Sequence, residues 1–115
     1  MNPLAEISVV LDLKQLKQHP EMEFEDDGIT VKINEEMITQ EIERQFKNKF
    51  INQRESFAIQ LYDKKAIMFA YVEKITPINV KSNLSYGIIE EDTDVMSKSR
   101  DPKKMKILTN RLQEK

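Results

Sequence analysis

Apolar residues recur at a helical spacing in the middle of the chain. Asn34 can cap a helix there, with Glu35 and Glu36 at its positive end and Lys47 and Lys49 at its negative end. The stripe along one helix face consists of Met37, Ile38, Ile42, Phe46 and Phe50. The pattern therefore predicts an amphipathic helix from Asn34 to Phe50 whose apolar face is buried.

Two strongly apolar runs follow this helix. In Ser56–Tyr62, Phe57, Ile59 and Leu61 alternate with smaller or polar residues, which is the period of a strand with one face on the core. Ala66–Val72 is apolar at nearly every position, so we expect a central strand that is covered on both faces. The polar residues 63–65 connect the two runs as a hairpin, although no Asn-Gly or Asp-Gly dipeptide fixes the turn type. The stretch from residue 34 to residue 75 thus organises the fold.

Shorter patterns predict the remaining elements. Ile7–Leu13 alternates as a first strand, and a long polar and acidic surface loop leads from it to Gly28. Residues 29–33 are expected to form a short strand. Residues 76–82 are expected to form a loop, because Pro77 lacks the amide that a central strand needs. Further strands are expected at residues 84–89, with Gly87 at a bulge or close approach, at residues 94–97 and at residues 105–108.

The predicted fold class is α+β, with one main helix packed on a small, mostly antiparallel sheet. The chain has 115 residues, which suits one domain, and we assign residues 1–108 to it and residues 109–115 to a tail or the start of a linker. The formal charge of −2 gives no overall attraction to nucleic acid or to an anionic membrane. Apolar runs are too short to span a bilayer, the start lacks the apolar core of a signal peptide, and cysteine is absent, so we expect a cytoplasmic protein.

Catalytic chemistry finds little support in the sequence. Gly28 and Gly87, the only glycines, cannot form a phosphate-binding loop, and His19, the only histidine, reads as an ordinary loop residue. Two acidic clusters, residues 21–27 and residues 90–94, do not match the calcium-loop pattern and read as solvated loops. The basic segment from Lys98 onward lacks interleaved aromatic residues, so no nucleic-acid partner is expected. We predict no catalytic residue, no metal site and no cofactor in this chain.

A family resemblance adds a function that these patterns could not supply. The helix ending Gln45-Phe46-Lys47-Asn48-Lys49-Phe50, the hairpin Phe57–Glu73 and the strand Ser85-Tyr86-Gly87-Ile88-Ile89 follow one another in the chain. This order resembles the second lobe of the N-terminal domain of the N-ethylmaleimide-sensitive factor family of vesicle-fusion ATPases. In that family a similar Gln-Phe-Asn-Asn-x-x-Phe helix end precedes a hairpin and a Gly-Leu-Val-Val strand. The resemblance covers about Ile7–Leu108 and implies a fold similar to the second N-terminal lobe of valosin-containing protein.

The resemblance implies that the chain binds an adaptor and does not catalyse a reaction. In this family the lobe grips the soluble attachment protein on SNARE complexes and couples ATP hydrolysis to SNARE disassembly. A lysine pair follows the first strand, and Lys14 and Lys17 occupy the matching connection, although their spacing departs from the family's adjacent pair. The parent would be a hexameric ATPase that uses ATP and magnesium and lies in the cytoplasm, peripherally at membranes through its partners. The lobe itself would be monomeric, without insertion into the membrane.

Two alternatives remain open from the sequence. The first is the equivalent cofactor-binding lobe of a protein-unfolding ATPase of the valosin-containing type. The second is a small metal-dependent enzyme that uses the acidic clusters. The preceding barrel lobe of the family and its ATPase modules are not present in the 115 residues, so the chain reads as an excised piece or as half of a binding site.

Overall fold

The described part of the chain forms strands and one helix, which follows the third strand. A computed structural model describes residues 2–79, 81 and 83–109. The elements are β1 (Leu4–Leu16), β2 (Glu23–Phe24), β3 (Val31–Asn34), α1 (Glu35–Gln45), β4 (Phe50–Asn52), β5 (Ser56–Leu61), β6 (Ala66–Pro77), β7 (Tyr86–Ile88), β8 (Asp94–Ser99) and β9 (Met105–Leu108). The predicted α+β class with one main helix is confirmed, and most strand pairs are antiparallel.

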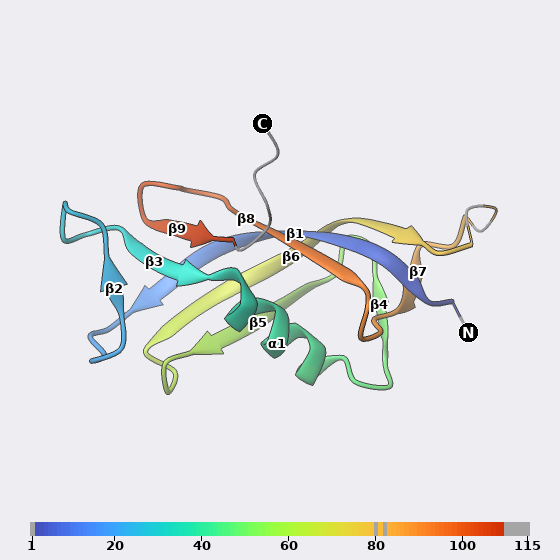
Figure 1. Ribbon diagram of the computed structural model, residues 1–115, viewed down its shortest axis with the longest axis horizontal. Helices are drawn as coiled ribbons and strands as arrows, with labels where there is room; N and C mark the ends of the chain where they lie inside the picture. Colours follow the sequence, from blue (N-terminus) through green and yellow to red (C-terminus); the bar gives the residue numbers. More distant parts are fainter. Residues whose placement is uncertain (1, 80, 82, 110–115) are drawn as a thin grey trace.

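The largest sheet has four strands in the order β5-β6-β1-β8 (Figure 1). β6 is antiparallel to both β5 and β1, and β8 is parallel to β1. The inner face carries fully buried side chains from the alternating positions of the strands, among them Ile7, Leu11, Ile59 and Met68. The predicted first strand and the predicted hairpin are therefore confirmed, with β1 three residues longer at each end than residues 7–13.

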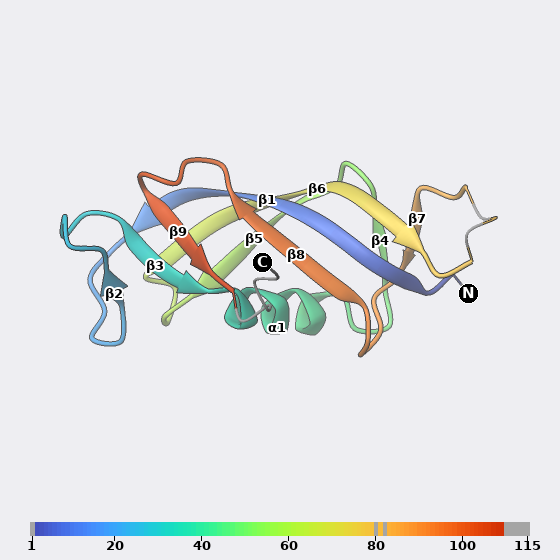
Figure 2. The ribbon, with the colours of Figure 1, turned by 45° about the horizontal axis from the view of Figure 1, so that its top comes forward.

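Two smaller sheets complete the fold (Figure 2). One has the order β2-β3-β9, with β9 parallel to β3, and the other pairs β4 with β7. The strand predicted at residues 105–108 is present with the predicted ends, and those predicted at residues 29–33 and 94–97 are present with shifted ends. Residues 14–27 are not one long surface loop as predicted, because β1 continues to Leu16, Met22 is buried and β2 pairs with β3.

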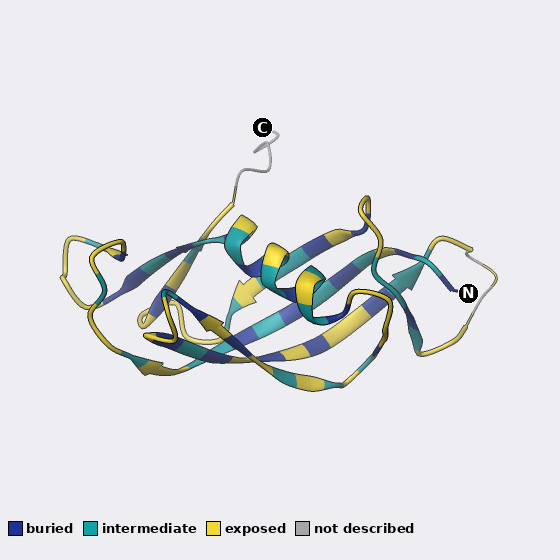
Figure 3. Ribbon diagram, turned by 90° about the horizontal axis from the view of Figure 1, so that it is seen from below, coloured by how far each residue is buried: buried dark blue, intermediate teal, exposed yellow. Residues whose placement is uncertain are grey.

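Helix α1 begins as predicted and ends earlier. The side chain of Asn34 accepts a hydrogen bond from the amide of Glu36 at 2.9 Å, and Ile38 and Ile42 are fully buried. The helix stops at Gln45, and Asn48 has a positive φ of 60°, which reverses the chain. Phe50 therefore belongs to β4 and is about half exposed, so its prediction as a buried helical residue was wrong. The buried stripe of α1 faces the main sheet and its polar side faces solvent (Figure 3).

The two ends of α1 bond to opposite edges of the main sheet. At its start, Oε2 of Glu35 accepts a hydrogen bond from the amide of Ser97 in β8 at 2.8 Å. At its end, Nε2 of Gln45 donates to the carbonyl of Ala58 in β5 at 2.8 Å. These side chains satisfy backbone groups that an edge strand otherwise leaves unpaired.

Strand β6 departs from its prediction in two ways. It is central, since it pairs with β5 and β1, yet its outer face is open, with Phe69 49% and Tyr71 42% exposed. It also continues to Pro77, where the predicted loop should already have begun. Pro77 is tolerated because it is the terminal residue of the strand, where its missing amide interrupts no ladder.

Gly87 lies where the backbone of β7 meets the first residues of the chain. A Cβ atom at this position would be 2.6 Å from the carbonyl oxygen of Asn2, so only glycine fits. The predicted close approach is confirmed, although the strand is shorter than residues 84–89. Residue 109 follows β9, and the rest of the predicted tail, residues 110–115, lies outside the described residues.

Replacing Ile42 with alanine should lower the free energy of unfolding by about 2–5 kcal/mol, because it leaves a cavity between α1 and the sheet. Urea denaturation followed by circular dichroism measures this. The control is Gln40→Ala at an exposed position of the same helix, which should change stability by less than about 0.5 kcal/mol. Equal effects of the two substitutions would contradict the packing described.

Candidate functional site

The two predicted binding lysines lie in different surroundings. Lys14 belongs to β1 and its side chain is half exposed; its Nζ is 2.9 Å from Oδ2 of Asp12 and 5.8 Å from the centre of the Phe69 ring. Lys17 follows the end of β1, and its amide donates to the carbonyl of Lys65 at 2.7 Å. Lys14 thus belongs to a face of the main sheet, whereas Lys17 lies at the end of that sheet beside the β5–β6 turn.

The outer face of the main sheet is the surface to which Lys14 belongs. Strand register places Tyr71 between Ser56 of β5 and Val10 of β1, and Val10 is opposite Lys98 of β8. One step along the strands, Phe69 lies between Ala58 and Asp12. We call this surface the open face. A depression of about 340 Å³ in it is lined by Val10, Asp12, Lys14, Ser56, Phe69, Ala70, Tyr71 and Arg100.

Positive charge exceeds negative charge around this depression. The hydrogen bond from Lys14 is the main reason that the pKa of Asp12 is lowered; burial opposes it, and the charges of Lys14, Arg100 and Lys104 each lower the pKa by a smaller amount than burial raises it. Nη1 of Arg100 is 3.9 Å from the same Asp12 oxygen, and its side chain is largely exposed. Since one carboxylate faces three cations, the depression retains a positive potential that favours an acidic partner.

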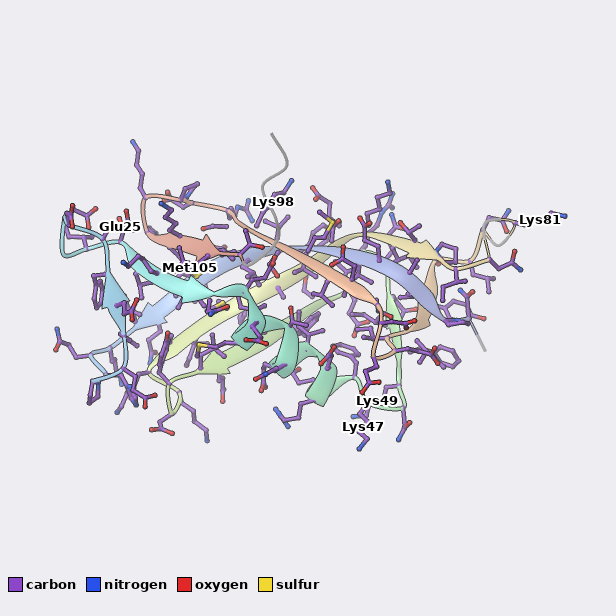
Figure 4. The ribbon with its side chains drawn as sticks, viewed as in Figure 1. Glu25, Lys47, Lys49, Lys81, Lys98 and Met105 are labelled. Atoms are coloured by element: carbon purple, nitrogen blue, oxygen red, sulfur yellow. The ribbon has the colours of Figure 1, made fainter. Side chains whose placement is uncertain are left out.

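Lys98 extends the charged part of the open face along β8 (Figure 4). Its Nζ is 3.3 Å from Oε1 of Glu73 in β6, and both side chains are substantially exposed. This second pair is an exposed contact that contributes little to stability. Because Glu73 balances the charge of Lys98, the excess of positive charge lies at the end of the open face that holds Lys14 and Arg100.

The acidic loops are built into turns. Both oxygens of Asp27 accept hydrogen bonds, from the amides of Ile29 and Thr30 at 2.8 and 2.9 Å and from the Thr30 hydroxyl at 2.7 Å. The bond from the Thr30 amide is the main reason that the pKa of Asp27 is lowered. Across residues 2–79, 81 and 83–109, no three histidine, aspartate or glutamate side chains are placed to hold a metal ion together.

His19 packs between the end of β1 and the β5–β6 turn. Its Nδ1 accepts a hydrogen bond from the amide of Glu21 at 3.1 Å, which leaves the ring proton on Nε2, 3.2 Å from Oδ2 of Asp63. Its ring also contacts the ring of Tyr62, with 5.5 Å between the centres. These contacts hold a connection in place and present no nucleophile to the imidazole.

Sequence reasoning missed the aromatic residues and Arg100 of the open face. They come from β6 and from the segment after β8, and only the sheet brings them beside Lys14. A signal was present in Ala66–Val72, where the positions of one parity hold Ala, Met, Ala and Val and those of the other hold Ile, Phe and Tyr. Larger aromatic residues confined to one parity indicate that the two faces have different surroundings.

The class that fold and surface define is a small α+β protein with an open, basic and aromatic sheet face. Neither the scan against models of protein families nor the search of the curated proteins finds a match for this sequence. In the part of the chain that is described, no helix combines the length and hydropathy needed to cross a bilayer.

Replacing Lys14 with alanine should raise the pKa of Asp12, because it removes the hydrogen bond that contributes most to the lowered value. A carboxylate with a lowered pKa stabilises the fold above its unfolded pKa, and this contribution is lost as the pH falls through the folded value. The mutation should therefore also reduce the loss of stability on acidification below the ordinary value of 3.8. Carboxyl-carbon NMR titration measures the pKa.

Lys98→Ala is the matched control, since it removes a lysine from the same face that bonds to Glu73 instead. It should leave the Asp12 titration unchanged. An unchanged Asp12 pKa in Lys14→Ala would contradict the ion pair.

Proposed function

We propose that this chain is the non-catalytic, adaptor-binding lobe of a vesicle-fusion ATPase. In this proposal it contacts acidic surface of the soluble attachment protein through Lys14 and Lys17 and so couples ATP hydrolysis elsewhere in the parent to SNARE disassembly. ATP and magnesium would act in the parent, which would work in the cytoplasm at the surface of membranes.

The order of the elements supports this proposal. Of the motifs that carry the family resemblance, Gln45–Phe50 runs from the last residue of α1 into β4, Phe57–Glu73 lies on the β5–β6 hairpin, and residues 85–89 contain β7. Gly87, the glycine of the resembling strand, also has a packing reason to be glycine, because the carbonyl of Asn2 occupies the space of a side chain. The resemblance thus rests on residues with structural roles in this fold.

The surroundings of Lys14 are the observation that carries the proposal. A binding lobe needs accessible side chains on a rigid frame, and Lys14 lies on β1, which pairs with β6 on both sides of this residue. The carboxylate of Asp12 holds its amino group in place, and Arg100 adds a second exposed cation beside it. Such charges steer an acidic partner and raise the rate of association.

The double substitution Lys14→Glu and Lys17→Glu should weaken binding of the attachment protein about tenfold at low salt. The effect should shrink as salt is added, because the interaction depends on exposed charges. Surface plasmon resonance with the isolated attachment protein measures both quantities, and the melting temperature should stay nearly unchanged since the substituted side chains are exposed.

Lys47→Glu with Lys49→Glu is the control, because it makes the same change of charge at exposed positions beyond the end of α1 (Figure 4). This variant should bind as the wild type does. Equal affinities of all three proteins would mean that the wrong lysines were assigned. If the chain instead bound ubiquitin-linked cofactors, it would be assigned to the protein-unfolding ATPases of the valosin-containing type.

A further inference from the structure

The open face carries two aromatic side chains that the fold itself does not use. Phe69 and Tyr71 lie two residues apart on the outer side of β6, so their side chains point the same way about 7 Å apart. Isolated exposed apolar residues are common on proteins, but neighbouring rings at the centre of a sheet indicate a contact surface. Val10 of β1 lies opposite Tyr71 and continues the apolar area.

We propose that Phe69, Tyr71 and Val10 form the apolar centre of a docking surface for an acidic protein segment. The segment would cover the two rings with an apolar side chain and direct a carboxylate to Lys14 and Arg100. That the partner is the attachment protein depends on the proposed function. That the partner segment is acidic and partly apolar is inferred from the residues of the open face.

Charge argues for an acidic occupant. Asp12 is the carboxylate of the depression, and Lys14, Arg100 and Lys104 act on it together, so a second carboxylate brought by a partner finds unbalanced cations. Arg100 is the most exposed of the paired cations here, with 71% of its side chain accessible. A planar guanidinium beside aromatic rings is the combination that dominates the binding energy in many protein interfaces.

The frame of the surface is rigid before a partner arrives. β6 pairs with β5 and with β1 at both Phe69 and Tyr71, so the backbone beneath the two rings is hydrogen-bonded on both sides, and Lys14 lies on β1 two residues beyond Asp12, the partner of Phe69. A partner would therefore lose little free energy in ordering these groups. The rings sit on the strands themselves, where their positions are fixed more closely than on a loop.

The edges of the sheet are less suited to a partner than its face. A peptide that extends a sheet bonds to the free amides and carbonyls of an edge strand. Here Gln45 occupies the carbonyl of Ala58 in β5 and Glu35 occupies the amide of Ser97 in β8. The side chains of α1 thus occupy one backbone group at each edge, whereas they leave the open face uncovered.

Single-stranded nucleic acid is the rival occupant, because bases stack on exposed aromatic rings beside cations. Two carboxylates, Asp12 and Glu73, lie on the same face, and the formal charge of the whole chain is −2. A phosphate backbone carries a charge at every nucleotide and would meet these carboxylates along its length, whereas a protein segment can place a single carboxylate at Lys14 and Arg100.

The double substitution Phe69→Thr and Tyr71→Thr tests the proposal, since threonine suits a strand and removes both rings. Affinity for the attachment protein should fall about tenfold, and by a similar factor at low and high salt, because the lost contact is apolar. The control is Ile29→Thr with Ile78→Thr, which removes apolar residues of equal or greater exposure that lie off the open face. It should bind as the wild type does.

Three results would contradict the proposed function, the docking inference or both. If the wild-type chain does not bind the attachment protein, this result contradicts both the proposed function and the partner assigned to the open face. If the wild type binds, the lysine variant binds weakly and the threonine variant binds normally, the docking inference alone fails. Loss of oligonucleotide binding in the threonine variant, with adaptor affinity unchanged, assigns the open face to nucleic acid and also overturns the inference.

A measurement without substitutions supplements these variants. Addition of the attachment protein to the isotope-labelled wild-type chain should shift NMR signals of Val10, Phe69 and Tyr71 together with those of Lys14. Shifts that avoid the aromatic residues would overturn the inference even if a variant proved unstable.

Discussion

The packing of α1 across the main sheet is the contact on which the rest of the structure depends. Eleven residues at about 1.5 Å each make a helix of about 16 Å, and four strands about 4.8 Å apart span about 14 Å from edge to edge. The match lets Glu35 reach β8 at one edge while Gln45 reaches β5 at the other. Between these ends Ile38 and Ile42 fill the space over the inner face. One short helix thus contributes buried side chains to the core and bonds to one backbone group at each edge of the sheet.

Because α1 covers one side of the main sheet, the two faces of its strands differ in burial. The inner side of β6 holds Ala66, Met68, Ala70 and Val72, which pack closely beneath the helix, with β3 and β9 alongside. Its outer side holds Phe69 and Tyr71, which no other layer covers in the described part of the chain. Stability and recognition can therefore change independently along one strand. A substitution on the outer side alters the surface without opening a cavity in the core.

The sequence predicted local structure well and long-range geometry poorly. The Asn34 cap, the alternation in β1 and the hairpin could be read locally, because period and capping chemistry depend on neighbouring residues. The end of α1 was missed because Phe50 continues the apolar spacing, whereas the positive φ of Asn48 had already reversed the chain. Both faces of β6 were predicted to be covered because both are apolar, although the aromatic residues are confined to one of them. Of the candidate site, the sequence singled out Lys14, whereas Arg100 lies beside Asp12 only because β8 pairs with β1 in parallel.

The open face is asymmetric, and that asymmetry constrains how a partner can lie on it. The rings belong to β6, while Lys14 belongs to β1, Lys98 to β8 and Arg100 to the segment directly after β8. Apolar contact is therefore concentrated over the inner strand nearer β5, and positive charge over the side that ends at β8. An acidic segment would place its apolar residue toward β5 and its carboxylates toward β8, since the reverse orientation would bury charge against Phe69 and Tyr71. Burial of an unpaired charge is costly, so the residues that would attract such a partner would also fix its direction.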